Sequence, residues 1–201
     1  MHRRTFLMGL PFALSACAGE RVWAPDDVVS RAFTPGSDIK SLTLYTMKNT
    51  GSDNGAHSAL MIDASQRVMF DPAGTWKQNY MPERNDVLFG VTPRMEQFYV
   101  SVHARVTYYV VGHRITVAPE IAEQALQKAL VAGPVAPANC TRYTARLLRS
   151  LPGFESLPQT WFPNALSDAF GQLPGVTTRE YRETDSDDKN RAQAVVPTAG
   201  Q

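Results

Sequence analysis

The chain has 201 residues, of which 43% are hydrophobic, and a formal net charge of +1 at pH 7. This length suits one domain with tails, and this apolar content is enough to build a hydrophobic core. A near-neutral charge without a basic, aromatic-rich stripe argues against nucleic-acid binding, so we expect no nucleic-acid partner.

The chain begins with the layout of an export signal. Arg3 and Arg4 form a basic start, an apolar stretch runs from Phe6 to Leu14, and small residues lead up to Cys17. The apolar stretch is too short to span a bilayer as a helix. Its ending, "LSAC", resembles the bacterial lipobox, and the arginine pair also resembles a twin-arginine export signal.

The lipobox resemblance implies a bacterial lipoprotein. We expect residues 1–16 to be removed as a signal peptide, Cys17 to carry lipid, and residues 17–38 to form a lipidated N-terminus and tether. Ala18 lacks the acidic residue that holds enteric lipoproteins at the inner membrane, which favours the outer membrane. The expected location is the cell envelope, lipid-anchored and facing the periplasm, while the choice between Sec and twin-arginine export stays open.

Three strands are predicted in the first half of the domain, at residues 41–47, 57–63 and 67–71. The first alternates polar with apolar residues and includes β-branched and aromatic side chains, and the last two flank a short turn at residues 64–66. Four apolar residues of this hairpin suit one buried face: Leu60, Ile62, Val68 and Phe70.

The middle of the chain is harder to interpret. Residues 75–97 contain Pro82 and Pro93 among polar clusters and predict a long loop with one short strand at "DVLFG". Residues 97–117 are rich in Val, Tyr and Phe, which favours one or two strands.

Helices dominate the second half. Pro119 in the first turn and Gly133 at the end predict a helix. Helices are also predicted at about residues 139–150 and 164–170, and a strand is predicted at residues 176–183. Strands with segregated helices predict an α+β fold with a mainly antiparallel sheet and packed helices. The domain would cover residues 39–183, and the polar residues 184–201 would form a disordered tail.

The chain has two cysteines, Cys17 and Cys140. If Cys17 carries lipid, Cys140 has no disulfide partner in the chain, although it lies outside the cytoplasm. It is either a small buried hydrophobe or a reactive thiol. Its place in the first turn of a predicted helix favours the thiolate, because the N-terminal N–H groups and the helix dipole stabilise negative charge.

A nucleophilic thiol needs a base, and three histidines follow the signal peptide. His57 opens a strand after a glycine-rich loop, at the rim of the predicted sheet, and is the best candidate. His103 lies in a strand-like stretch and suits a structural or surface role. His113 follows Gly112 in a predicted turn and is expected to be solvated.

Asp71 is the candidate for the third polar group that orients the imidazole. Pairing Asp63 with Arg67 across the turn places Asp71 on the same face as His57 and diagonally adjacent to it. Asp71 could instead be a turn residue before Pro72, and Asp63 is the weaker alternative.

The motifs "HSALMI", "VMFDPAG" and, much later, "NCTRYTARLL" resemble the circularly permuted branch of papain-like cysteine hydrolases. That branch is related to NlpC-type cell-wall peptidases and to the lecithin–retinol acyltransferase group. In it the histidine strand precedes an "NC" motif that opens a helix, and His57 precedes Cys140 here. The resemblance covers roughly residues 40–182 and implies a permuted papain-like fold. The second histidine of the acyltransferase members is missing here, where the chain has "VMFD".

The resemblance implies Cys140 as nucleophile, His57 as base and Asp71 as the third polar residue. The expected activity is hydrolysis or acyl transfer at an amide or ester carbonyl, such as a cell-wall peptide amide, with an acyl lipid as second choice. Asn139 is expected to cap the helix, and the first-turn N–H groups would hold the oxyanion. No metal-ligand motif is present, so no metal or cofactor is expected. The alternative is a non-catalytic envelope lipoprotein that uses this fold for binding or scaffolding.

Overall fold

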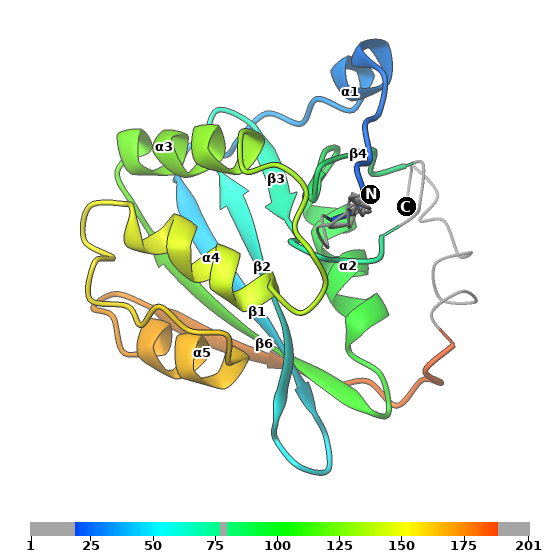
Figure 1. The fold of residues 1–201 in the computed structure, drawn as a ribbon, viewed down its shortest axis with the longest axis vertical. Coiled ribbons are helices and arrows are strands. Elements are labelled where there is room, and N and C mark those ends of the chain that lie inside the picture. The colour runs from blue at the N-terminus through cyan, green and yellow to red at the C-terminus, as the bar shows by residue number, and fades with distance from the viewer. Residues whose placement is uncertain (1–18, 77–79, 189–201) are drawn as a thin grey trace, which may run out of the picture.

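A computed structural model describes residues 19–76 and 80–188 of the chain (Figure 1). The predicted signal peptide, the lipidation residue Cys17 and residues 189–201 of the predicted tail lie outside the described residues. Among the helices described, none is long and apolar enough to cross a membrane.

The fold is α+β, with one seven-stranded sheet in which all neighbouring strands are antiparallel. The strand order across the sheet is β4-β5-β3-β2-β1-β6-β7. The strands are β1 Ser41–Asn49, β2 Gly55–Asp63, β3 Arg67–Phe70, β4 Glu83–Arg84, β5 Val87–Leu88, β6 Tyr108–Thr116 and β7 Thr177–Tyr181.

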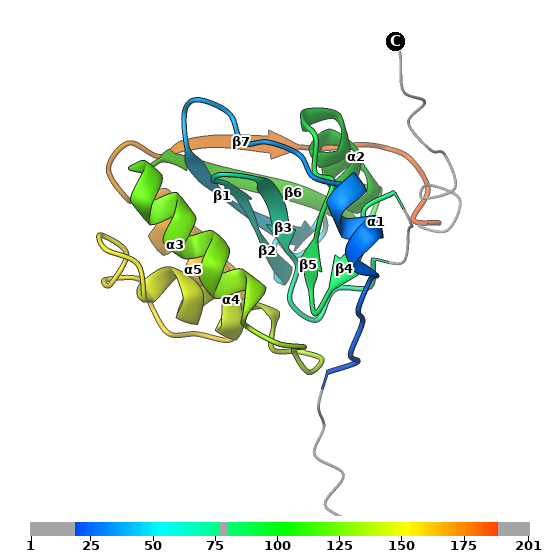
Figure 2. The same cartoon turned by 90° about the horizontal axis from the view of Figure 1, so that it is seen from above.

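Helices lie on both faces of this sheet (Figure 2). Three of them, α3, α4 and α5, cover one face, which we call the first face, and α2 covers the other, the second face. The helices are α1 Asp26–Arg31, α2 Pro93–His103, α3 Pro119–Leu130, α4 Cys140–Arg149 and α5 Pro163–Gly171.

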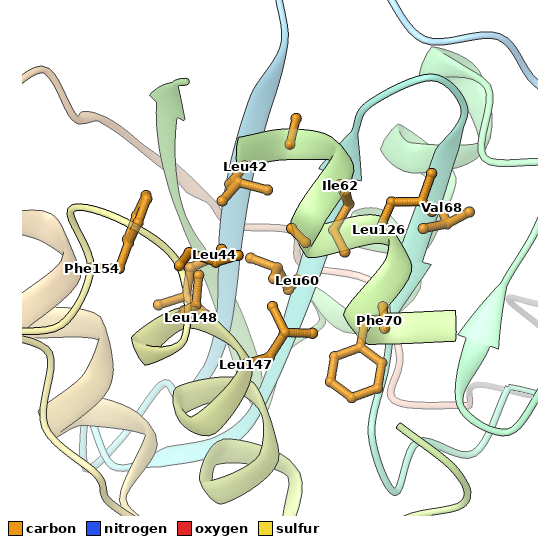
Figure 3. Packing of buried hydrophobic residues seen from close by; sticks show 14 of the residues in the cluster. Leu42, Leu44, Leu60, Ile62, Val68, Phe70, Leu126, Leu147, Leu148 and Phe154 are labelled. Atoms are coloured by element: carbon orange, nitrogen blue, oxygen red, sulfur yellow. The ribbon is translucent and has the colours of Figure 1, made fainter. Parts of the chain in front are cut away.

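The predicted hairpin register is confirmed. Asp63 pairs with Arg67 and Leu60 with Phe70, so the four apolar residues assigned to one face do share it. They pack with Leu42 and Leu44 of β1 and with the apolar stripes of α3 and α4 in the larger core cluster (Figure 3). Because the side chains of a strand alternate, the odd-numbered residues of β2 point to the second face.

One strand forms within residues 97–117, where one or two were expected, but residues 97–103 belong to α2 and not to a strand. Thr92 caps the helix by accepting a hydrogen bond from the N–H of Met95 at 3.1 Å, and Pro93 occupies its first turn. Tyr99, Val100 and Val102 are buried against the second face, so tertiary packing overrides the strand preference of these residues. The second part of the segment does form a strand, β6.

The prediction of a solvated His113 is wrong. His113 is buried in β6, and its two ring nitrogens lie 2.8 Å from the hydroxyl of Thr178 and 3.0 Å from that of Ser167. These bonds join β6 to β7 and to α5, so this histidine is part of the scaffold.

Parts of the predicted tether and tail pack on the domain. Trp23 forms a β-bridge with Arg84, and α1 follows directly after it. At the other end, the backbone carbonyl of Asp185 accepts a hydrogen bond from the N–H of Val106 at 3.0 Å.

Candidate active site

The candidate site lies at the edge where β3 ends. β3 pairs only with residues 60–63 of β2. Residues 55–59 of β2 therefore have no neighbouring strand at the edge that faces β3. The first turn of α4 occupies this place, and the backbone N–H of Ser58 donates a hydrogen bond to the sulfur of Cys140. A register irregularity in the β1–β2 ladder comes directly before His57, a common way to re-aim a side chain beside a site.

Cys140 opens α4 as predicted, and only 9% of the residue is exposed. Its helix has the predicted amphipathic pattern, with Thr144, Leu147 and Leu148 buried on the same side. The hydroxyl of Thr144 donates to the backbone carbonyl of Cys140 at 3.0 Å, which fixes the first turn. Directly before Asn139, Ala138 has a left-handed backbone conformation with φ 64°, a strained geometry that the surrounding structure must hold.

The prediction that Asn139 caps α4 with its side chain is wrong. Its amide donates instead to the carbonyls of Ala136 and Pro137, and its oxygen accepts from the indole of Trp161 at 3.3 Å. The first-turn N–H groups of α4 therefore receive no cap from this side chain, and they are suited to bind another anion.

His57 and Asp71 form the predicted pair. Nε2 of His57 lies 2.5 Å from Oδ1 of Asp71, whose side chain is 3% exposed. Gly74 turns tightly against this carboxylate, since a Cβ at that position would stand 2.1 Å from Oδ2. Because Nε2 faces Asp71, Nδ1 is the ring nitrogen left for the hydrogen bond between His57 and the thiol of Cys140.

The charges of this group favour a thiolate and an imidazolium. Burial raises the pKa of the Cys140 thiol, but the hydrogen bond with His57 and the positive charge of its ring outweigh burial and lower that pKa to about 7. Burial likewise opposes protonation of His57, yet the charge and hydrogen bond of Asp71 raise its pKa to about 10. Because the thiol is the stronger acid of the two, the proton belongs on the ring at neutral pH.

Asp71 remains ionised under these conditions. Burial raises its pKa, and the neighbouring charge and hydrogen bond of His57 more than offset burial, so the pKa of Asp71 lies below its usual range. An ionised carboxylate on Nε2 keeps the ring oriented and supports its positive charge.

Asp86 ties the two halves of the site together, and sequence reasoning missed it. Its carboxylate accepts from the N–H of Val135 at 2.6 Å and of Ala73 at 3.2 Å, and its carbonyl accepts from the N–H of Asp71 at 2.8 Å. It therefore links the segment after β3 to the segment that leads into α4. No local pattern indicates this role, because its hydrogen-bond partners at residues 71, 73 and 135 are far from Asp86 in the sequence.

Tyr99 and His103 of α2 also lie at the site. Burial and the nearby charge of Asp71 raise the pKa of the Tyr99 hydroxyl well above its usual value, while His103 interacts with the charge of Asp71. The signal for them was available: the Thr92–Pro93 helix start predicts an α-helix, and its period places residues 99 and 103 on one side.

A cavity of about 240 Å³ lies on the second-face side of the pair, lined by His57, Asp71 and His103 among others. Its wall at residues 73–75 is shared with a larger cavity of about 850 Å³. That cavity is mainly apolar, with Trp23, Trp76 and Met81 in its lining, and Pro137 borders it shortly before Cys140. A mainly apolar cavity therefore adjoins the small cavity that His57 and Asp71 line.

The other candidates are not at the site. Asp63, the weaker alternative for the third polar group, is at the far end of β2, where it accepts hydrogen bonds from Arg67 and Ser37. Within the described residues no three His, Cys, Asp or Glu side chains are grouped as a metal site would need.

The chain was compared with known proteins at three levels. No protein-family model, no curated protein and no solved structure matches it.

Proposed function

We propose that the chain is an envelope-anchored cysteine hydrolase or acyl-transfer enzyme in which Cys140 attacks an amide or ester carbonyl. The observation that carries this proposal is the contact chain from the Cys140 thiol through His57 to Asp71 at the start of α4. The order of His57 before Cys140, with the cysteine helix packed on an antiparallel sheet, supports the permuted papain-like arrangement that the motifs suggest. The anchor would be lipid on Cys17, which would place the enzyme at the outer membrane, facing the periplasm.

The acylation step begins with the proton of Cys140 on His57. The thiolate attacks the carbonyl carbon, and the carbonyl oxygen becomes an oxyanion that accepts hydrogen bonds from the first-turn N–H groups of α4. As the tetrahedral intermediate collapses, the imidazolium gives its proton to the leaving amine or alcohol. The acyl group then remains on the sulfur as a thioester, and His57 is neutral.

Neutral His57 next acts as a base. It takes a proton from water, or from an alcohol or amine acceptor, and the resulting nucleophile attacks the thioester carbonyl. The sulfur leaves as a thiolate beside the newly formed imidazolium, which is the starting state. Asp71 keeps its charge throughout and stabilises the imidazolium at both stages.

Two substrate classes suit the location. A peptide amide of the cell wall is the first, because an envelope enzyme would meet it. An acyl ester is the second, and the apolar cavity of about 850 Å³ next to residues 73–75 favours it. A panel of short peptides and of esters with increasing chain length separates the two, since only an acyl site gains rate with chain length.

The proposal is tested by thiol labelling across pH. A full-length chain carrying Cys17→Ser has Cys140 as its single cysteine, and the rate of iodoacetamide alkylation reports the thiolate. The rate should be half-maximal near pH 7, as the pKa of Cys140 requires. An ordinary thiol has its midpoint at about 8.5.

His57→Ala should move the midpoint above about 8.5, because it removes the positive charge and leaves burial to raise the thiol pKa. The matched control is His103→Gln, which changes a histidine of the same cavity and should leave the midpoint nearly unchanged. An ordinary midpoint in the unsubstituted chain would contradict the dyad and favour a binding or scaffolding lipoprotein.

A further inference from the structure

The outer side of α4 concentrates positive charge. Arg142, Arg146 and Arg149 are exposed there, on the side opposite the buried stripe that begins with Cys140. The helix contains no acidic residue, and none of the ion pairs in the described part of the chain involves these arginines. In a chain with a net charge of only +1, this is a local positive surface.

Two exposed aromatic residues adjoin these arginines. Trp161 is 55% exposed and Phe162 is 72% exposed, although large aromatic side chains are usually buried. The guanidinium of Arg142 lies over the ring of Trp161, 4.7 Å from its centre, and the carbonyl of Arg142 accepts a hydrogen bond from Gln159. No acidic residue occurs between Pro158 and Pro163. We call these five residues, Arg142, Arg146, Arg149, Trp161 and Phe162, the arginine–aromatic surface.

We propose that the arginine–aromatic surface docks on an anionic lipid bilayer and sets the orientation of the site toward the membrane. Arginines bind phosphate headgroups, and exposed Trp and Phe side chains settle at the boundary between headgroups and acyl chains. A surface of this composition has charge complementarity to anionic lipids, and its aromatic residues distinguish it from a purely basic patch.

The start of the described chain lies beside the segment that leads into α4, the helix that carries these arginines. Gly19 is so close to Val135 that a Cβ on it would stand 2.5 Å from the carbonyl oxygen of that residue. Figure 2 shows this first segment leaving the domain beside the connection between α3 and α4. The predicted lipid on Cys17 is two residues from Gly19, a reach of at most about 7 Å. A bilayer that holds the lipid would therefore lie near the N-terminal end of α4.

The test is binding to vesicles by the processed chain, residues 17–201, with Cys17→Ser, which has neither the predicted lipid nor the basic, apolar signal peptide. The vesicles are equimolar phosphatidylglycerol and phosphatidylcholine, or phosphatidylcholine alone, and binding is followed by co-sedimentation at two salt concentrations. We expect binding to the anionic vesicles that weakens with salt. Arg146→Gln should weaken it roughly fivefold, and Arg142→Gln with Arg146→Gln about 25-fold, since each basic residue at an anionic surface contributes a factor of about five.

Two matched controls come from other parts of the molecule. Arg114→Gln removes an exposed arginine on the second face and should change binding less than about twofold, because screening limits its reach. Phe162→Ser should weaken binding, whereas Phe33→Ser, at a residue that is 58% exposed, should not. Circular dichroism and urea unfolding check that each variant folds.

Three vesicle-binding results would overturn the proposal: no binding to anionic vesicles, equal binding to phosphatidylcholine, or equal losses in the Arg114 and Arg146 variants. If the arginine variants instead abolish self-association in sedimentation equilibrium, the surface is an interface between copies of the chain, and the lipid proposal fails. Vesicle binding does not use the thiol, and thiol labelling does not use vesicles. Failure of this proposal is therefore distinguishable from failure of the proposed enzyme activity.

Discussion

The two faces of the sheet are held by different chemistry. The first face carries an apolar cluster in which Leu42, Leu44, Leu60 and Ile62 are fully buried beneath α3, α4 and α5. The second face buries charge as well as apolar side chains. There Arg67 forms ion pairs with Asp63 and Glu96, and its Nε donates to the carbonyl of Val91 at 2.9 Å.

The difference shows where chemistry can be placed in this fold. An apolar face tolerates changes in shape but offers no fixed charges, while a face with buried ions depends on the geometry of each hydrogen bond. The candidate site joins the two: α4 of the first face supplies Cys140, and His57 and Asp71 are on the second-face side of the strands. A reactive thiol therefore depends on both kinds of packing at once.

The largest expected effect is on the second face. Arg67→Met should lower the free energy of unfolding by about 3–5 kcal/mol, because it leaves the buried carboxylate of Asp63 and the partly buried carboxylate of Glu96 without their charged partner. Urea unfolding measures it. The triple variant that also carries Asp63→Asn and Glu96→Gln should recover part of the loss, since the stranded charges are removed. A loss below about 1 kcal/mol for Arg67→Met would show that the ion pairs do not hold this face.

The apolar cluster of the first face should respond to volume and not to hydrogen-bond geometry. Leu60→Ala should cost about 2–5 kcal/mol of unfolding free energy, because it opens a cavity under α4. Leu60→Met, which nearly keeps the volume, should cost less than about 1.5 kcal/mol. The corresponding conservative change on the second face, Arg67→Lys, should cost more than Leu60→Met, because a single ammonium group cannot reproduce three separate bonds. Equal costs for the two conservative changes would remove the distinction between the faces.

The first face could be predicted from the sequence. Alternation in the hairpin identified its buried residues, and the turn at residues 64–66 fixed the register that places Asp71 beside His57. The helical period around Cys140 predicted which side of α4 is buried. These are short-range patterns, which a single sequence contains in full.

The second face could not be predicted to the same extent. Residues 97–103 have the composition of a strand, and against this preference stand the helix start at Thr92–Pro93 and the packing of Tyr99, Val100 and Val102 on the sheet. The error concealed Tyr99 and His103, which reach the site only if the segment is a helix. The role of Asp86 depends on backbone groups at residues 73 and 135, and nothing in the local sequence shows that those segments meet.

An intermediate effect is expected at a polar contact between β2 and α4 on the first face, next to the site. The hydroxyls of Ser58 on β2 and Thr141 on α4 lie 3.0 Å apart and are buried, and Thr141 also lies 3.7 Å from the sulfur of Cys140. Thr141→Val should cost about 1–3 kcal/mol, since it leaves the Ser58 hydroxyl unpaired. It should also raise the midpoint of Cys140 alkylation, because the Thr141 hydrogen bond lowers the thiol pKa.

A double-mutant cycle isolates that link. Ser58→Ala alone should cost a similar amount, and the double variant should cost less than the sum of the two single changes, because neither hydroxyl is then stranded. Strict additivity in urea unfolding would mean that the two hydroxyls do not couple α4 to β2.

The smallest effect is expected at Tyr99, where the second face meets the site. Its ring is fully buried, but its hydroxyl has no hydrogen bond of ordinary geometry among the described residues, although the charge of Asp71 is close. Tyr99→Phe removes a polar atom that gains little from burial, so the free energy of unfolding should change by less than about 1 kcal/mol, in either direction.

The alkylation midpoint of Cys140 in Tyr99→Phe should stay within roughly 0.3 pH units of the unsubstituted value, because His57 supplies most of the stabilisation of the Asp71 carboxylate. Removing a hydrogen bond to a charged group costs about 2 kcal/mol or more. A loss of unfolding free energy of that size in Tyr99→Phe would therefore mean that Tyr99 donates a full hydrogen bond to Asp71. In that case the buried polar network of the second face would extend into the site, and α2 would position the carboxylate that orients His57.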